Sequence, residues 1–142
     1  MRTQVRFRTS LFRPMDHHTE QSENGLELAQ WLCANLPARF MADHMDEDWG
    51  QRIILGDPLL NAKVSVCCGS VKEDCWSCFV EPRRSFVGSL LGRALPTAEL
   101  ETVVRALDSL IAATPAFVEV EWCENDKRHC EFNHAARAFA PA

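Results

Sequence analysis

The amino-acid sequence predicts an α+β fold, in which two amphipathic helices cover one face of a mainly antiparallel sheet as a two-layer sandwich. Two segments carry apolar residues at helical spacing, several short segments alternate apolar and polar residues, and two of the latter are joined by a short polar link. The expected order of elements is β-α-β-β-β-β-α-β. Residues 1–122 are expected to form a single domain, with residues 123–142 as a loosely attached tail.

The first helix is expected from about residue 24 to residue 39, where apolar side chains recur on one face. Either Ser22 or Asn24 would cap its N-terminus, since both side chains accept hydrogen bonds from free backbone N–H groups. A second helix is expected to begin at Thr97 and to stop before Pro115. The expected strands cover residues 5–12, 40–45, 49–55, 63–68, 75–81 and 117–122.

The clearest strand pair is the hairpin of residues 63–68 and 75–81. The six residues that separate the two runs include Gly, Ser, Lys, Glu and Asp, a composition typical of a connecting loop. In this arrangement Cys68 and Cys75 face each other across the hairpin and can oxidise in vitro.

The length, net charge, apolar runs and cysteine content of the chain limit its expected compartment and partners. At 142 residues the chain can bury a core without metal or disulfide, and its formal net charge of −5 argues against nucleic acid as a partner. No apolar run approaches the roughly 20 residues that span a bilayer, and the N-terminus lacks the apolar region of a secretory signal. Seven cysteines without such a signal predict reduced thiols and a cytoplasmic protein with no membrane partner.

The most distinctive cluster is an acidic step formed by Asp46, Glu47, Asp48 and Trp49. One interpretation is a solvated loop whose tryptophan covers the edge of the sheet. A second is a recognition surface, in which the carboxylates engage a basic protein partner and the tryptophan is an anchor. A third is a divalent-cation site that includes Asp43, although the spacing is not that of an EF-hand.

Arg83 and Arg84 carry the opposite charge in a later loop. They would form ion pairs with the acidic step inside the fold, or bind an anionic ligand. A cleft between this loop and the acidic step would suit a small ligand or an enzyme substrate.

The cysteines offer a weak alternative, a zinc site formed by Cys67, Cys68, Cys75 and Cys78. However, Cys75 and Cys78 lie three apart in an expected strand, so their side chains point to opposite faces. Small buried hydrophobic residues are the simpler interpretation. We therefore expect no metal and no cofactor. The sequence also lacks the nucleophile-elbow, zinc-protease, phosphate-loop and dinucleotide motifs, and no catalytic residue is assigned.

Residues 25–32, 47–50 and 76–83 carry a resemblance. An Ala-x-Trp-Leu helix, a Glu-Asp-Trp-Gly step and a Trp-containing hairpin that ends in Val-Glu-Pro resemble a group of small uncharacterised bacterial proteins. The similarity covers roughly residues 5–122, and the hairpin cysteines depart from its pattern. The resemblance implies a bacterial cytoplasmic protein and carries no activity.

Two classes of function remain open at this point. The first is a non-enzymatic protein-binding module, such as an adaptor or an immunity-type protein, whose acidic, Trp-containing surface is steered to a basic partner. The second is a small-ligand-binding protein or an enzyme that uses the cleft beside Arg83 and Arg84. The sequence does not indicate an oligomeric state.

Overall fold

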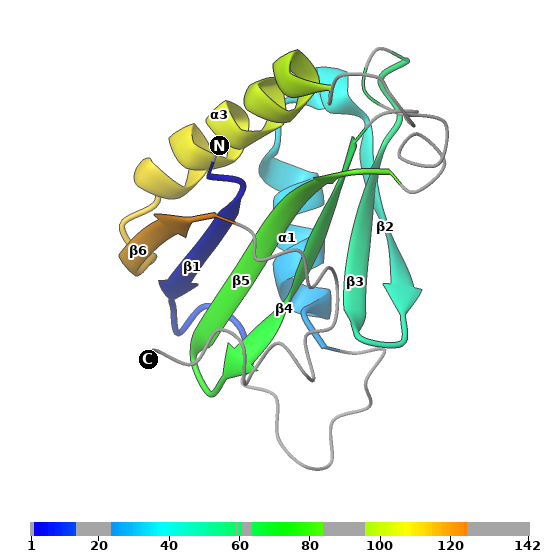
Figure 1. Ribbon diagram of the computed structural model, residues 1–142. Coiled ribbons are helices and arrows are strands. Elements are labelled where there is room, and N and C mark those ends of the chain that lie inside the picture. Colours follow the sequence, from blue (N-terminus) through cyan, green and yellow to red (C-terminus); the bar gives the residue numbers. More distant parts are fainter. Residues whose placement is uncertain (1, 14–23, 59, 61–63, 84–95, 125–142) are drawn as a thin grey trace.

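The computed structural model describes residues 2–13, 24–58, 60, 64–83 and 96–124 (Figure 1). Over these ranges the chain forms an antiparallel six-stranded sheet and two α-helices, which confirms the predicted α+β class. The strands follow the order β2-β3-β4-β5-β1-β6 across the sheet, so β2 and β6 are its two edges. The elements are β1 (Gln4–Arg8), α1 (Leu26–Asn35), the 3₁₀ helix η2 (Ala38–Phe40), β2 (Ala42–Glu47), β3 (Gly50–Leu55), β4 (Val64–Lys72), β5 (Cys75–Pro82), α3 (Thr97–Ala112) and β6 (Val118–Cys123).

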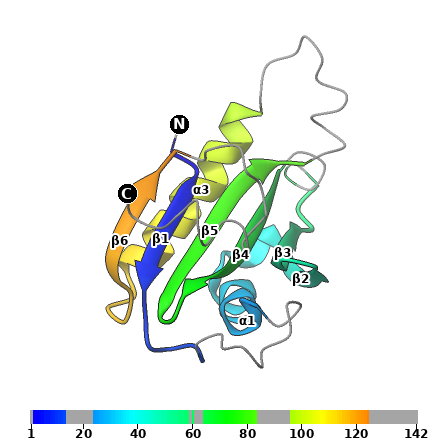
Figure 2. The same ribbon diagram turned by 60° about the horizontal axis from the view of Figure 1, so that its bottom comes forward.

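The main core lies between the sheet and the helices. Leu28 and Leu32 of α1 and Val103 and Leu107 of α3 are at most 1% exposed, and they share one apolar cluster with alternate strand residues such as Val66. Both helices lie on the same side of the sheet (Figures 1 and 2). Each fully buried leucine or valine contributes about 1.5–3 kcal/mol to the free energy of unfolding, so this cluster is the main source of stability.

The first helix is shorter than predicted. It ends at Asn35, and Leu36 is already extended (φ −63°, ψ 156°). Pro37 explains the early stop, because the residue before a proline is pushed out of the helical conformation. Residues 38–40, which include the predicted end of the first helix, form the 3₁₀ helix η2 instead.

No described helix is long and apolar enough to cross a membrane.

The hairpin of β4 and β5 has a tighter turn than predicted. Only Glu73 and Asp74 lie between the strands, and Glu73 is in the left-handed region with φ 41°. Residues 69–72, expected in the loop, instead extend β4. Cys68 is therefore opposite Cys78, and the predicted pairing of Cys68 with Cys75 is wrong.

Candidate functional site

The acidic step forms the tip and the outer strand of the β2–β3 hairpin. Glu47 is the last residue of β2, Asp48 and Trp49 make a two-residue turn, and Gly50 opens β3 opposite Glu47. Asp46 and Asp48 are exposed, whereas Trp49 is half-buried. The hairpin therefore divides the step into an outward part and an inward part.

Asn24 attaches this hairpin to the rest of the fold. Its buried side chain donates from Nδ2 to the Trp49 carbonyl at 3.0 Å and accepts from the Ser70 backbone N–H at 2.7 Å. The N-cap of α1 is Gly25, so the predicted capping role of Asn24 is wrong. The other predicted cap, Ser22, lies outside the described residues. Asn24 thus connects three segments that are far apart in the sequence.

Two glycines permit the close packing at this junction. A Cβ atom on Gly50 would lie 2.8 Å from the Cys68 carbonyl oxygen, and one on Gly25 would lie 2.9 Å from the same atom. Gly25 also has φ +78°, a conformation that residues with a side chain rarely adopt. Gly50, which follows the acidic step, is therefore required by backbone contact.

Arg52 of β3 holds the inward part of the step. Its Nε lies 3.1 Å from Glu47 Oε1, and its Nη1 lies 2.8 Å from Ser65 Oγ and 3.2 Å from Glu81 Oε1. The guanidinium carbon also lies 5.6 Å from the centre of the Trp49 ring, within cation–π range. Glu47 and Trp49 therefore have partners within the fold.

Cys67 completes this buried polar cluster. Its Sγ donates to Glu81 Oε1 at 3.2 Å, and Glu81 is only 6% exposed. The sequence pattern alone does not connect Arg52, Ser65 and Glu81. Their alternation with apolar neighbours was visible, but their proximity depends on the register of three strands. The cluster lies on the sheet face that neither described helix covers.

The outward part of the step and the nearby Asp43 carry negative charge that no described cation neutralises. The structure pairs none of Asp43, Asp46 and Asp48 with a lysine or arginine of the described ranges. Asp46 Oδ1 accepts from Gln51 Nε2 at 2.7 Å, and the Gln51 carbonyl oxygen lies 3.1 Å from His44 Nδ1. These hydrogen bonds orient the carboxylate without neutralising it.

Two methionines lie along the same edge. Met41, just before β2, is 65% exposed, and Met45 within β2 is 47% exposed. Methionine side chains are flexible and polarisable, and they adapt to irregular apolar partners. We call the surface formed by Met41, Asp43, Met45, Asp46 and Asp48 the acidic edge.

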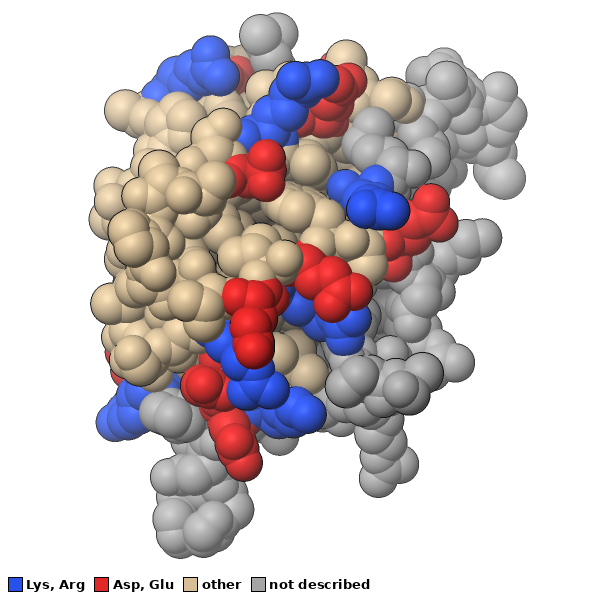
Figure 3. All heavy atoms as spheres, turned by 90° about the vertical axis from the view of Figure 1, so that its left-hand side faces the viewer, with Lys and Arg blue, Asp and Glu red and all other residues tan. Residues whose placement is uncertain are grey.

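The opposite edge of the sheet has acidic residues in a different setting. Glu119 of β6 lies 2.7 Å from Arg8 Nε, and Glu121 lies 3.7 Å from Arg6 Nη2. Asp74 also pairs with Arg8 at 2.6 Å and raises the pKa of that guanidinium, with Glu119 adding to the shift. Figure 3 shows acidic and basic side chains side by side on this side of the molecule.

The predicted pairing of the acidic step with Arg83 and Arg84 remains a prediction. Arg83 is half-buried just after β5, and Arg84 lies outside the described residues. Within the described ranges, the arginine that contacts Glu47 is Arg52. The cleft between the step and the Arg83–Arg84 loop, and the ligand or enzyme function attached to it, stay hypotheses.

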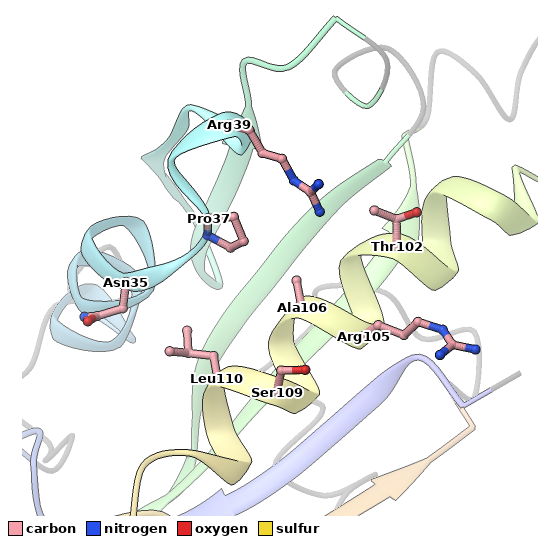
Figure 4. Close-up of a pocket in the computed structure, with 8 residues that line it drawn as sticks. All are labelled: Asn35, Pro37, Arg39, Thr102, Arg105, Ala106, Ser109 and Leu110. Atoms are coloured by element: carbon pink, nitrogen blue, oxygen red, sulfur yellow. The ribbon is translucent and has the colours of Figure 1, made fainter.

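A groove that the sequence did not suggest lies between the C-terminal end of α1 with η2 and the outer surface of α3 (Figure 4). Its volume is about 600 Å³, within the usual range for small-molecule sites. No sequence pattern indicated it, because its walls meet only in the folded chain. It is lined by Asn35, Pro37, Arg39, Thr102, Arg105, Ala106, Ser109 and Leu110.

The four hairpin cysteines are divided between the two faces of the sheet. Cys68 and Cys78 belong to the core under the helices, whereas Cys67 and Cys75 pack with Phe79 on the other face. Their sulfur atoms therefore do not converge on a single position, as a zinc site requires. Within the described part of the chain, no group of three or more metal-binding side chains comes together.

Comparison with protein-family models, with curated proteins and with solved structures finds no match in any of the three. The resemblance to the bacterial group with the Glu-Asp-Trp-Gly step stays an expectation.

Proposed function

We propose that the protein is a non-enzymatic binding module that recognises a basic protein partner through the acidic edge. One observation carries the proposal. Three exposed carboxylates, Asp43, Asp46 and Asp48, have no lysine or arginine partner in the described ranges, and two exposed methionines, Met41 and Met45, lie along the same edge. The charges would steer a cationic partner, and the methionines would supply adaptable apolar contact.

The inward part of the step, Glu47 and Trp49, holds the hairpin that carries the acidic edge. Arg52 neutralises Glu47 and lies over Trp49, and Asn24 holds the Trp49 carbonyl. A recognition surface benefits from such support, because a rigid backbone loses less entropy on binding. Trp49 therefore acts in this proposal as a support for the hairpin more than as the exposed anchor expected from the sequence.

Side-chain recognition suits the edge better than addition of a further strand. The backbone N–H of His44, at the middle of β2, already donates to Asp43 Oδ1 at 2.9 Å. Strand addition needs open backbone donors along the edge, and charged side chains on an edge strand discourage it. The partner would contact the carboxylates and methionines themselves.

In this proposal the sheet and helices form a two-layer sandwich and the protein works in the cytoplasm.

Capture of partners from a lysate of the source organism tests the proposal. The variant Asp46→Asn/Asp48→Asn removes two charges from the acidic edge, and Glu119→Gln/Glu121→Gln removes two charges from the other edge. We expect the first pair to lose the captured protein and the second to retain it. Adding salt should weaken capture by the wild type, since surface charges are screened. Equal capture by both double variants would refute the proposed surface.

A further inference from the structure

The groove between η2 and α3 has the properties of an anion site that is separate from the acidic edge. Arg39 projects from η2 over the gap toward α3 (Figure 4). Arg105 lines the same groove from α3. The protein as a whole has a net charge of −5, so two arginines on one groove are a local reversal of charge. Such a reversal attracts an anionic ligand to this position.

Arg39 is available for a ligand. Its guanidinium lies 5.3 Å from the centre of the Phe40 ring, and no carboxylate among the described residues pairs with it. The contact with the ring orients the planar group without using its five N–H donors. Arginine matches carboxylate and phosphate oxygens with parallel hydrogen bonds, which makes Arg39 the principal binding group.

Arg105, unlike Arg39, forms an ion pair within its own helix. Its Nε and Nη2 both donate to Glu101 Oε1, at 2.9 and 2.6 Å, one helical turn away. The side chain of Arg105 is 77% exposed and that of Glu101 is 47% exposed, so water screens the pair and weakens it. The Nη1 group has no acceptor in the described part of the chain, and it remains a donor for a ligand. Arg105 is therefore a secondary binding group that Glu101 attenuates.

The remaining lining of the groove is suited to an organic body. Pro37, Ala106 and Leu110 contribute apolar surface, and Ala106 and Leu110 also pack against the main core. The Thr102 hydroxyl donates to the Ala98 carbonyl at 2.8 Å, so it has only acceptor capacity left for a ligand. An inorganic anion would leave the apolar surface unused.

From these contacts we propose that the groove binds a small organic anion, a phosphate monoester or carboxylate joined to an apolar body. The anionic head would lie at Arg39 with assistance from Arg105, and the body would cover Ala106 and Leu110. This site does not depend on the acidic edge. Loss of either activity would leave the other intact.

Titration of the ¹⁵N-labelled full chain with phenyl phosphate, benzoate and inorganic phosphate tests this site by NMR. We expect the two organic anions to shift the amide signals of Thr102, Ala106 and Leu110. Arg39→Ala should weaken binding about tenfold or more, as expected for a lost charge-assisted hydrogen bond. Arg105→Ala should weaken it about threefold, and Glu101→Gln should strengthen it about twofold, in line with a weak exposed ion pair.

Arg13→Ala is the matched control, because Arg13 is exposed, pairs loosely with Glu27 at 3.7 Å and lies outside the groove. It should bind as the wild type does. Absence of shifts at the groove with both organic anions would overturn the proposal. So would equal binding by wild type and Arg39→Ala, or binding of inorganic phosphate as tight as that of phenyl phosphate.

Discussion

The two edges of the sheet carry similar residues with opposite consequences. On β6, Glu119 and Glu121 lie beside Arg8 and Arg6 of the neighbouring strand, and each forms an ion pair. On β2, the neighbour of Asp46 is Gln51, which donates a hydrogen bond and no charge. Figure 3 shows the interleaved charges on the β6 side. The residues supplied by the adjacent strand, and not the acidic residues themselves, decide whether an edge presents free charge.

The edges also differ in how they avoid unwanted strand pairing. β6 exposes Val118 and Val120, at 50% and 40%, but it carries an irregularity opposite the segment between Arg6 and Arg8, where Glu119 has φ 50°. Bulges and charged side chains are both known ways to protect an edge. β6 relies on a bulge, whereas β2 relies on charge. Only the second solution leaves a surface suited to a cationic partner.

A large effect is expected from Gly50→Ala, in the hairpin of β2 and β3, which lies at the opposite end of the sheet from β6. The new Cβ would lie 2.8 Å from the Cys68 carbonyl oxygen, so backbone must move. We expect a loss of about 2–4 kcal/mol in the free energy of unfolding, typical of overpacking combined with backbone strain. Urea denaturation measures the loss, and hydrogen exchange should show faster opening of β2 and β3 than of β6. Uniform opening of both edges would contradict the local account.

Removing one arginine near each edge of the sheet, Arg52 of β3 or Arg6 of β1, compares a buried ion-pair cluster with an exposed ion pair. Arg52→Ala would remove an ion pair from the buried carboxylate of Glu81, and we expect it to cost about 2–4 kcal/mol. Arg6→Ala removes an arginine of nearly the same exposure, 20% against 21%, whose partner Glu121 is 67% exposed. That change should cost less than about 1 kcal/mol. Similar losses in urea denaturation for both variants would show that the Arg52 cluster is not a buried network.

A smaller effect concerns the thiol of Cys33, which reports the charge of Asp43. Burial, with a further contribution from Asp43, raises the pKa of Cys33 from 9.0 to about 11. The folded protein therefore favours the neutral thiol, and this contribution to stability is present below pH 9 and is lost as the pH rises toward 11. Carbamidomethylation of Cys33, followed by peptide mass spectrometry, should show a rate midpoint near pH 11.

Asp43→Asn should lower that midpoint, because it removes the negative charge that adds to the effect of burial. Asp48→Asn is the control, since Asp48 does not contribute to the shift. A midpoint near the ordinary thiol value in the wild type, or an equal change in both variants, would show that Asp43 does not act on Cys33.

The smallest stability effect is expected from the exposed carboxylates themselves. Asp46→Asn/Asp48→Asn should change the free energy of unfolding by less than about 0.5 kcal/mol, because neither residue has a cationic partner in the described ranges. Glu119→Gln/Glu121→Gln should reduce it by up to about 1 kcal/mol, since both side chains are in ion pairs. Thermal unfolding at low salt compares the two, and the reverse order would contradict the contrast between the edges.

The sequence predicted the elements better than their contacts. The order of helices and strands and the antiparallel sheet followed from periodicity, which is a local property of the chain. The loop at residues 69–74 was overestimated, because glycine and serine usually mark turns. Here Gly69 continues a strand against which Gly25 packs closely.

For the candidate sites, too, the sequence predicted which residues stand out but not which residues they contact. The acidic step was visible as a run of carboxylates, but nothing local indicated that Arg52 would pair with Glu47 and that Asp46 would have no cationic partner in the described ranges. That outcome depends on strand register. The groove at Arg39 and Arg105 was missed entirely, because it depends on how the end of α1 meets α3.

Binding of a basic amphipathic peptide with alternating lysine and leucine tests most directly whether the acidic edge is a surface for cationic partners. Fluorescence anisotropy at low salt would compare wild type with the two equally charged variants, Asp46→Asn/Asp48→Asn and Glu119→Gln/Glu121→Gln. We expect about tenfold or greater weakening in the first variant, little change in the second, and loss of wild-type binding at high salt. Equal weakening in both variants would mean that net charge, and not the acidic edge, attracts the peptide.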